Sequence, residues 1–452
     1  MIGDLDSMDY AENESRLQEV YRRLHALEHE RRVVSSAEEL EALEREIRAE
    51  TDRLASVLLE RQVQANLDSA EQQAAEAELI AAWPGRLKSE GRERVRIRTV
   101  EGGEIELRVR YYRRRCDRRR GKRYRGVYAG LVLMGIHERC TPWLGAQVSA
   151  WSALLSSFAE VVQVLADHGL VLGVKTVRQL SYRYAERARA VQHSAGVAWD
   201  EGDTMRGRRV VISGDGGRVR LREPKLFIVY VVDAQGKLAK CFAPVLEGTL
   251  RGPDAWLSLL RGYLQSLRLE QADQVLFVAD GAQWIWNRVG TLVKALGLDR
   301  QRVHELIDFY HAVEHLGKVA ALRQSWSAKE RRRWVRQHRQ LLLKGHVESV
   351  MEAVRALCRG RHTKAVTTER NYFIRHQQRM DYPTMKTLGL PLGSGAVESA
   401  IRRVVNLRLK GSCLFWYREN ADKMLMLRSY YKAGRWNLLK KMANSHLSLL
   451  AT

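Results

Sequence analysis

Three carboxylates that lie far apart in the sequence are placed where they could do chemistry together. Asp215 and Asp280 each end an apolar, β-branched run and are followed at once by glycine, whereas Glu398 follows a glycine-rich loop near the expected start of a helix. Acids at the carboxyl ends of buried strands face the crevice in which α/β sheets bind ligands. Three gathered carboxylates repel one another unless hard divalent cations, Mg²⁺ or Mn²⁺, lie between them. Asp215, Asp280 and Glu398 are therefore the predicted catalytic residues and the ligands of two metal ions, an arrangement suited to in-line phosphoryl displacement.

The segments around these acids predict the elements that would position them. Three consecutive strands are expected in RRVVISGD, KLFIVYVVD and KLAKCFAPVLEG. Helices are expected at 254–267 and 284–296, with the strand that leads to Asp280 between them. The next strand, within RVHELIDFYH, ends on Asp308, and from about 316 to 388 the sequence is basic and helical in pattern. The chain is thus expected to fold as an α/β core interrupted by a helical span.

Several ordered motifs make the chain resemble bacterial insertion-sequence transposases of the DDE class, and most of all the ISKra family. These motifs are Asp215 with its two following glycines, DGAQWIW at 280–286, IDFYHAVEHL at 307–316, GSGAVES at 393–399 and the tail KGSCLFWYRENADKMLMLRS at 410–429. The resemblance covers roughly residues 95 to 436. It implies an α/β RNase H-like catalytic core with an all-α insertion between the last strand and the helix of the third acid, and the span 316–388 fits that insertion.

Asp308 and His311 match the Asp-x-x-His signature that Mutator-like and related transposases share. The resemblance implies an accessory role for this pair, in orienting the metal site or holding DNA, and structural support of the sheet edge is the alternative. His311, Glu314 and His315 also read as H-x-x-E-H, an inverted zinc-protease motif. That motif is short and arises often by chance, and a strongly cationic peptidase would be unusual, so we favour the first interpretation.

The composition indicates a polyanionic partner. Lys and Arg number 76 against 53 Asp and Glu, which gives a formal net charge of +23 and a pI near 10.0. Such an excess of positive charge favours nucleic acid, although a ribosome-associated or generally adhesive basic protein has the same signature. The five cysteines form no C-x-x-C pair, the N-terminus is polar and acidic, and no run approaches the ~18 apolar residues of a membrane helix. We expect a soluble bacterial protein in a reducing cytoplasm, associated with the nucleoid.

Ahead of the core, the sequence predicts three segments. Residues 1–85 are helical, and an interrupted heptad seam from Leu40 to Val57 predicts either a coiled-coil dimerisation arm or a helical hairpin packed on the protein's own body. Residues 86–135 predict a β-hairpin followed by a basic block, which would bind the DNA backbone or remain a solvated run of charge. Residues 136–205 have the outline of a helix-turn-helix, or of an ordinary packed helix pair. The core would then occupy 206–315 and 389–452, with the insertion at 316–388.

Basic and aromatic residues in these segments are the predicted DNA contacts. The glycines at 393 and 395 could leave backbone amides for a phosphate, but their loop lacks the Lys-Ser/Thr ending of a P-loop, so no nucleotide cofactor is expected. The predicted DNA-binding residues are Arg113, Arg114, Arg115, Arg118, Lys175, Arg178, Arg183, Arg332, Trp334, Arg402 and Arg403.

Together these expectations describe a DNA transposase. As a homodimer or higher homo-oligomer, it would bind the double-stranded terminal repeats of its own insertion sequence, hydrolyse DNA at those ends and join the freed 3′-hydroxyls to target DNA. No covalent enzyme intermediate would be needed, because positioning and charge stabilisation dominate phosphoryl transfer. A metal-dependent nuclease of the same fold, which would not join ends, is one alternative. A catalytically inactive DNA-binding protein is the other, and the presence of all three acids speaks against it.

Overall fold

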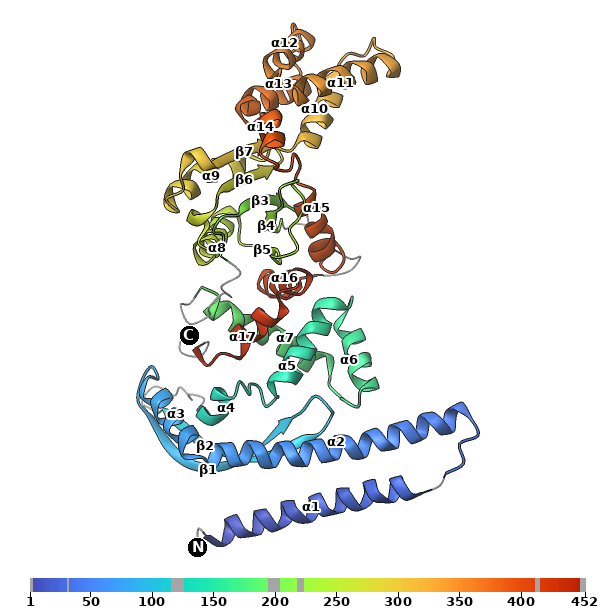
Figure 1. The fold of residues 1–452 in the computed structure, drawn as a ribbon, viewed down its shortest axis with the longest axis vertical. Helices are drawn as coiled ribbons and strands as arrows, with labels where there is room; N and C mark the ends of the chain where they lie inside the picture. The colour runs from blue at the N-terminus through green and yellow to red at the C-terminus, as the bar shows by residue number, and fades with distance from the viewer. Residues whose placement is uncertain are drawn as a thin grey trace. The chain divides into compact units, whose positions relative to one another are not determined.

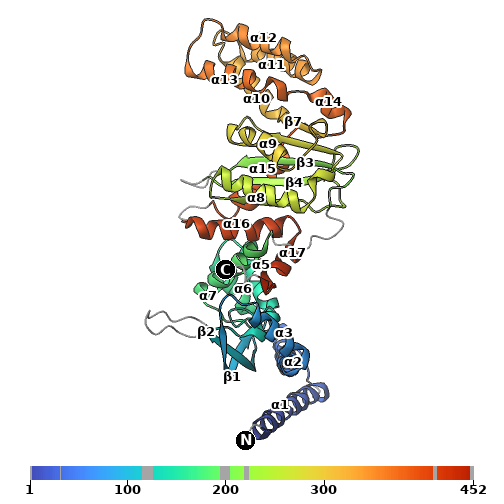
Figure 2. The same ribbon diagram turned by 90° about the vertical axis from the view of Figure 1, so that its left-hand side faces the viewer.

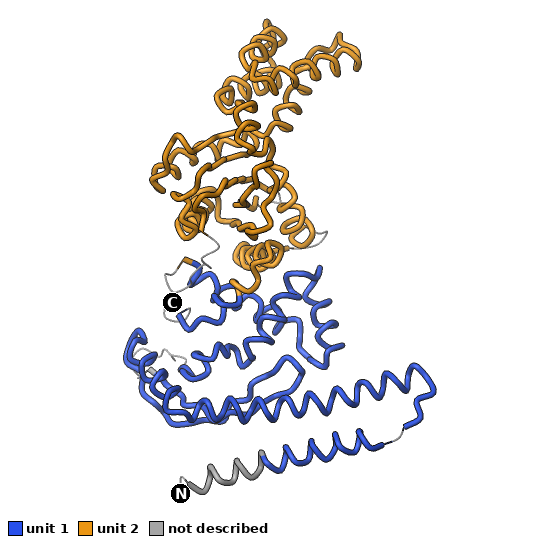
Figure 3. The backbone as a smooth tube through the Cα atoms, in the orientation of Figure 1, with its two compact units in different colours: residues 1–192, 440–452 blue, residues 193–439 orange. Residues whose placement is uncertain are grey.

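The computed structural model of the protein describes residues 3–30, 32–114, 126–193, 204–217, 223–410 and 415–447. The chain divides into two compact units, one of residues 1–192 with 440–452 and the other of residues 193–439 (Figure 3). Among the described residues, none of the helices combines the length and the apolar character that crossing a membrane requires.

The first unit begins with an antiparallel pair of long helices, α1 (Gly3–His29) and α2 (Ala37–Asp68), which lie side by side in Figures 1 and 2. Ion pairs such as Arg16–Glu60 (2.9 Å) join them, and the Ser36 side chain caps α2 by accepting from the backbone of Glu39. The helical hairpin, one of the two arrangements predicted for this segment, is thus present within a single chain. Along the predicted seam, Val57 is buried, whereas Leu40 and Ile47 are 49% and 44% exposed.

The predicted β-hairpin is present as β1 (Leu87–Arg98) and β2 (Glu104–Arg114), paired antiparallel around a turn at Gly102, whose φ is +85°. Alternate residues of the hairpin, including Ile97 and Leu107, are buried against α2. Helices α3 (Ala70–Ala81) and α4 (Ala129–Leu133) pack beside it. Of the predicted basic block, Arg115 and Arg118 lie outside the described residues.

Three further helices complete the described part of this unit: α5 (Pro142–Leu154), α6 (Phe158–Asp167) and α7 (Val174–Val191). Ser157 caps α6, and a short turn containing Gly169 joins α6 to α7, as the sequence predicts. Their shared core, which includes Leu144, Val161 and Val177, is fully buried. The N-terminal half of α7 keeps its polar face exposed.

The second unit is built on a five-stranded mixed sheet in the order β5-β4-β3-β6-β7 (Figure 1). The strands are β3 (Arg209–Gly216), β4 (Lys225–Val232), β5 (Val245–Thr249), β6 (Gln274–Ala279) and β7 (Val303–Ile307). The first three are successively antiparallel, whereas β6 and β7 run parallel to β3. Strands β4 and β6 are near-continuous apolar runs and almost entirely buried, as expected of a sheet with both faces covered.

Helices α8 (Pro253–Ser266) and α9 (Gln283–Ala295) cover one face of the sheet, and α15 (Gly395–Ile401) lies on the other (Figures 1 and 2). The starts and ends of α8 and α9 agree with the predicted helices to within one residue. Short 3₁₀ turns precede β6 and β7, at Leu269–Gln271 and Arg300–Arg302.

The predicted all-helical span follows β7. It contains α10 (Phe309–Ala321), α11 (Ala328–Leu343), α12 (Val347–Cys358), α13 (Lys364–His376) and α14 (Tyr382–Thr387), with a 3₁₀ turn at Gln377–Arg379. The first of these helices begins earlier than the sequence suggests, directly after Asp308.

After this insertion the chain returns to the sheet through α15 and continues into a π-helical turn, η6 (Arg402–Asn406), then α16 (Arg418–Lys432) and α17 (Trp436–Asn444). The π-helical turn begins at Arg402, whose backbone N–H still bonds the carbonyl of Glu398 one α-helical turn earlier, so the geometry widens only beyond this pair. The buried guanidinium of Arg428 donates to the backbone carbonyls of Val404 (2.7 Å) and Arg403, which anchors the widened turn.

Candidate metal site at the strand ends

The carboxyl ends of β3, β6 and β7 meet at one edge of the sheet, and each carries an aspartate. Asp215 is the next-to-last residue of β3, Asp280 follows β6 directly, and Asp308 follows β7. The three strands are parallel to one another, so their carboxyl ends face the same side. Glu398 comes from α15, which packs against β3 and β4. The fold therefore brings acids from four distant segments to one place.

The pKa of Asp215 indicates that the carboxylates of Asp280 and Glu398 lie near it. Burial raises the pKa of Asp215, the negative charges of Asp280 and Glu398 raise it further, and the result is a pKa of about 6. The backbone N–H of Gly216, which donates to Asp215 Oδ1 at 2.6 Å, offsets only part of this effect. Like charges shift a carboxyl pKa upward only when they are near, so the three acids share one electrostatic neighbourhood.

Asp280 is held at its strand end by the start of α9. Its Oδ1 accepts from the backbone N–H of Ala282 (3.0 Å), and its backbone carbonyl accepts from Trp286 Nε1 (2.6 Å). These two bonds fix the turn that follows β6, so the carboxylate cannot swing away from the sheet edge without breaking them.

Asp308 is almost fully buried, and hydrogen bonds occupy both of its carboxylate oxygens. Oδ1 caps α10 by accepting from the backbone N–H groups of Tyr310 (2.6 Å) and His311 (3.1 Å). Oδ2 accepts from the backbone N–H of Ser394 and from Ser394 Oγ (2.6 Å). Four donors surround this carboxylate, so a metal ion that bound Asp308 would have to displace one of them. Asp308 instead ties the end of β7 to the start of α15.

The side chains of His311 and Glu398 lie close to each other at the same edge of the sheet. His311 Nε2 lies 3.4 Å from Glu398 Oε1, and Ser394 Oγ lies 3.5 Å from the same oxygen. Burial lowers the pKa of His311, but the surrounding carboxylates, Asp308 and Glu314 foremost, raise it above its ordinary value overall. This imidazole can therefore act as a cationic partner of Glu398.

The geometry agrees with the predicted metal ligands in part. Among the described residues, the group of three ligand-bearing side chains whose atoms lie within 4.8 Å of one another is Asp308, His311 and Glu398, rather than Asp215, Asp280 and Glu398. Mutual repulsion, which the raised pKa of Asp215 reflects, favours wider spacing of the latter three. The described group that could hold a metal ion thus includes Glu398, one of the three predicted ligands, whereas Asp215 and Asp280 lie near this group without belonging to it. Carboxylate oxygens suit Mg²⁺ and Mn²⁺, whereas an imidazole suits softer transition metals, so His311 fits a role as the partner of Glu398 better than a role as a ligand of these ions.

The geometry does not favour the zinc-protease interpretation. His315 Nδ1 lies 2.6 Å from Glu369 Oε2, and its ring stacks on Tyr372. Within the part of the chain that is described, His311 and His315 do not belong to a common group of metal-binding atoms.

The predicted DNA contacts are mostly at the surface where the structure describes them. Arg113, Lys175, Arg178, Arg332, Arg402 and Arg403 are exposed, and Arg183 is partly exposed, 3.9 Å from Glu138. Trp334 is half-buried and stacks on His338, with 4.0 Å between ring centroids, which limits its access to a base. Of Arg114, only the backbone is described.

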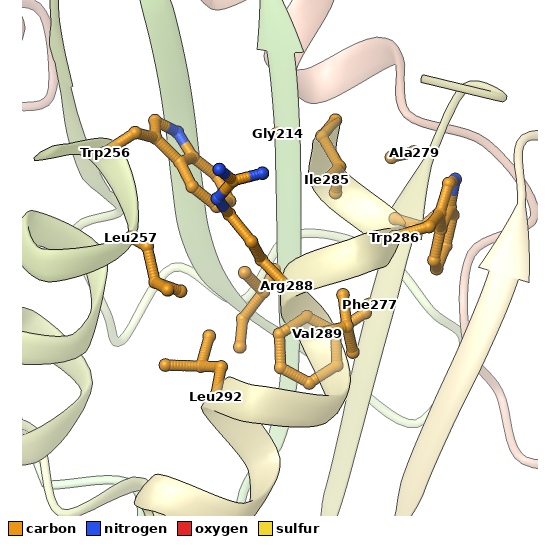
Figure 4. A pocket seen from close by; sticks show the side chains of 12 residues that line it. Gly214, Trp256, Leu257, Phe277, Ala279, Ile285, Trp286, Arg288, Val289 and Leu292 are labelled. Carbon is orange, nitrogen blue, oxygen red and sulfur yellow. The ribbon is translucent and has the colours of Figure 1, made fainter. Parts of the chain in front are cut away.

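A small pocket lies under the strand ends, between the sheet and helices α8 and α9 (Figure 4). Its lining is apolar apart from Arg288, which pairs with Asp254 at 2.6 Å. Trp256 fills the space beside Gly214 so closely that a Cβ added there would lie 2.8 Å from the indole. The pocket belongs to the packing that supports Asp215 and Asp280.

Sequence reasoning missed two side chains at this site. Ser394 connects Asp308 with Glu398, and a serine at the start of an expected helix is a recognisable capping signal. Tyr372 comes from the insertion and packs against Gly281. No motif in the sequence marks Tyr372, because its partners are distant along the chain.

Compared with models of protein families and with curated protein sequences, the chain matches none of them.

Proposed function

We propose that this chain is a DDE-class DNA transposase with an RNase H-like catalytic core. The observation that carries the proposal is the convergence of Asp215, Asp280 and Glu398 at the strand ends, where the charges of two acids raise the pKa of the third. The sheet supports it, because three antiparallel strands continue into two parallel ones, with the first strand at the centre. The resemblance to insertion-sequence transposases supplies the reaction.

In this proposal the side chains at the sheet edge have different roles in the reaction. When bound, Mg²⁺ or Mn²⁺ would activate the attacking oxygen and stabilise the leaving oxygen. Asp215, Asp280 and Glu398 hold the metal, and His311 orients Glu398 from 3.4 Å. Arg402 and Arg403, both exposed just beyond Glu398, neutralise phosphates of the bound DNA. Positioning and charge stabilisation then lower the barrier without a covalent enzyme intermediate.

The test is a cleavage and joining assay on DNA that carries the repeats flanking the protein's own coding sequence. Wild-type protein with Mg²⁺ is expected to nick the repeat ends and join them to target DNA, and Asp280→Asn is expected to bind the same DNA without reacting. Nicks without joined products would assign a metal-dependent nuclease instead. Tight binding with no reaction from either protein would identify a DNA-binding protein.

DNA recognition is proposed to rest partly on α7, which would lie in the major groove with its exposed Lys175 and Arg178 against the flanking phosphates. We expect Arg178→Gln to weaken repeat binding and to reduce the slope of log K against log salt by about 1, since one phosphate contact is lost. Arg45→Gln, a change at an exposed arginine on α2, is the matched control and should leave the slope unaltered. An identical slope for wild type and Arg178→Gln would remove this residue from the interface.

We also propose that the protein acts as a homodimer or larger homo-oligomer. The support is local: Leu40 and Ile47, one heptad apart on α2, remain about half exposed after α1 has packed, so α2 retains apolar surface for a second copy.

A further inference from the structure

Tyr372 of α13 packs against Gly281, the residue that follows Asp280 at the candidate metal site. It is 8% exposed, and its ring stacks on His315 with 3.6 Å between centroids and 15° between planes. His315 lies one helical turn after His311 on α10 and is itself held by Glu369. The stack therefore fixes the phenol ring beneath the helix that carries His311.

The hydroxyl end of this ring lies against the turn that follows Asp280. A Cβ built on Gly281 would lie 2.4 Å from Tyr372 Cε2, the ring carbon next to the one that bears the hydroxyl. Only glycine leaves room for that approach. His376, one turn further along α13, hydrogen-bonds the backbone of Gly281, so the same helix holds this turn at two points.

The Tyr372 hydroxyl is buried and has no hydrogen-bond partner among the described residues. Leaving a buried hydroxyl unpaired costs about 1–3 kcal/mol, so this hydroxyl calls for a partner that the described residues do not supply. Burial, and then the negative charges of Asp280 and Asp308, raise the pKa of Tyr372 far above neutrality. A phenol hydroxyl carries a proton to donate, and a site lined with carboxylates presents acceptors, so donation is the hydrogen bond that this hydroxyl offers the site.

We propose that Tyr372 is the hydrogen-bond donor that the insertion contributes to the metal site, and that its partner is an electron-rich oxygen beside Asp280. Two sources have this chemistry, a water bound to the metal or a non-bridging oxygen of the scissile phosphate. The inference rests on the proposed phosphoryl-transfer function and extends it, because it makes the insertion part of the reaction site.

The neighbouring polar groups do not fill this role. Tyr382 also has a buried hydroxyl without a described partner, but its ring packs on Phe309 (5.0 Å between centroids), on the Asp308 side of the site. His376 is neutral at physiological pH, because burial lowers its pKa to about 4, and its contact with Gly281 turns it toward the backbone.

The experiment compares Tyr372→Phe with wild type and with Tyr230→Phe. The change removes one oxygen and keeps the ring that stacks on His315, so the thermal midpoint is expected to be unaltered. Tyr230, on β4, is equally buried and its pKa is raised by burial alone, without a carboxylate, so its replacement controls for the loss of any buried hydroxyl. Two quantities are measured: Mn²⁺ affinity of the DNA-free protein by electron paramagnetic resonance, and the single-turnover nicking rate on repeat DNA.

A fall of about tenfold in Mn²⁺ affinity would place the donor on a metal-bound water, since loss of an outer partner of a metal site has an effect of that size. Unchanged Mn²⁺ affinity with about a tenfold slower nicking rate would place it on the phosphate. Wild-type values for both quantities in Tyr372→Phe, or equal losses in Tyr230→Phe, would overturn the proposal. If wild-type protein does not cut DNA, the proposed function fails, and the Mn²⁺ titration alone decides whether Tyr372 serves a metal site.

Discussion

Replacing Asp215 with asparagine is expected to abolish DNA cleavage and joining while making the metal-free protein more stable at neutral pH. Burial and the charges of Asp280 and Glu398 raise the pKa of Asp215 from 3.8 to about 6 in the folded chain. Between these two values the folded protein binds more protons than the unfolded one, so wild-type stability falls as the pH rises through this window. Asparagine has no such ionisation. The free energy of unfolding of Asp215→Asn should equal that of wild type near pH 4. It should exceed the wild-type value increasingly up to about pH 6, and the difference should then remain constant at about 2 kcal/mol.

Urea unfolding in EDTA at several pH values measures the stability, and nicking with Mg²⁺ measures the activity. Loss of a metal ligand is expected to slow nicking about a thousandfold. Asp254→Asn is the matched control, because Asp254 is a solvated acid of the same unit whose side chain is 90% exposed. Equal stability of Asp215→Asn and wild type at pH 8 would contradict the electrostatic account, and retained strand transfer would remove Asp215 from the catalytic residues.

Replacing Asp308 with asparagine is expected to destabilise the protein and slow nicking together. The carboxylate accepts from four donors, whereas an amide presents one oxygen, and its NH₂ group must then face either the α10 amides or Ser394. A buried bond network broken on one side costs about 3 kcal/mol. Because Ser394 starts the helix that bears Glu398, nicking should slow about a hundredfold. Ser394→Ala keeps the backbone bond to Asp308 and should cost about 1 kcal/mol.

Thermal unfolding and Mn²⁺ titration separate a positioning role of Asp308 from direct metal binding. Asp299→Asn is a suitable control, because Asp299 caps an exposed 3₁₀ turn and asparagine caps equally well. An Asp308→Asn protein of wild-type stability that no longer binds Mn²⁺ would show that Asp308 is a ligand after all.

The sequence predicted the elements whose signals are local. The apolar run Val275–Ala279 has the length and β-branched content of a buried strand, and Asp280-Gly281 marks its end. Helices α8 and α9 carry their own amphipathic patterns and lie where predicted. The strand-end placement of Asp215 and Asp280 follows from these same signals.

What the sequence could not predict depends on partners far along the chain. Asp308 was placed correctly at a strand end, but two of its four hydrogen bonds come from Ser394, which is 86 residues away. The π-helical turn at Arg402 depends on the buried Arg428 that binds its carbonyls, and a regular helical repeat gives no sign of it. Nothing in the sequence around Tyr372 indicates that its ring packs against Gly281, which lies far away along the chain.

The order in which a ribosome makes this chain determines when the candidate site is complete. Asp215 and Asp280 emerge early, but Glu398 reaches them only after Ser394 has met Asp308 across the whole insertion, and its helix is anchored only once Arg428 has been added. A nascent or truncated protein that ends before α16 therefore holds an incomplete site. Under the proposed function, late assembly of the last acid would keep unfinished chains from cutting DNA.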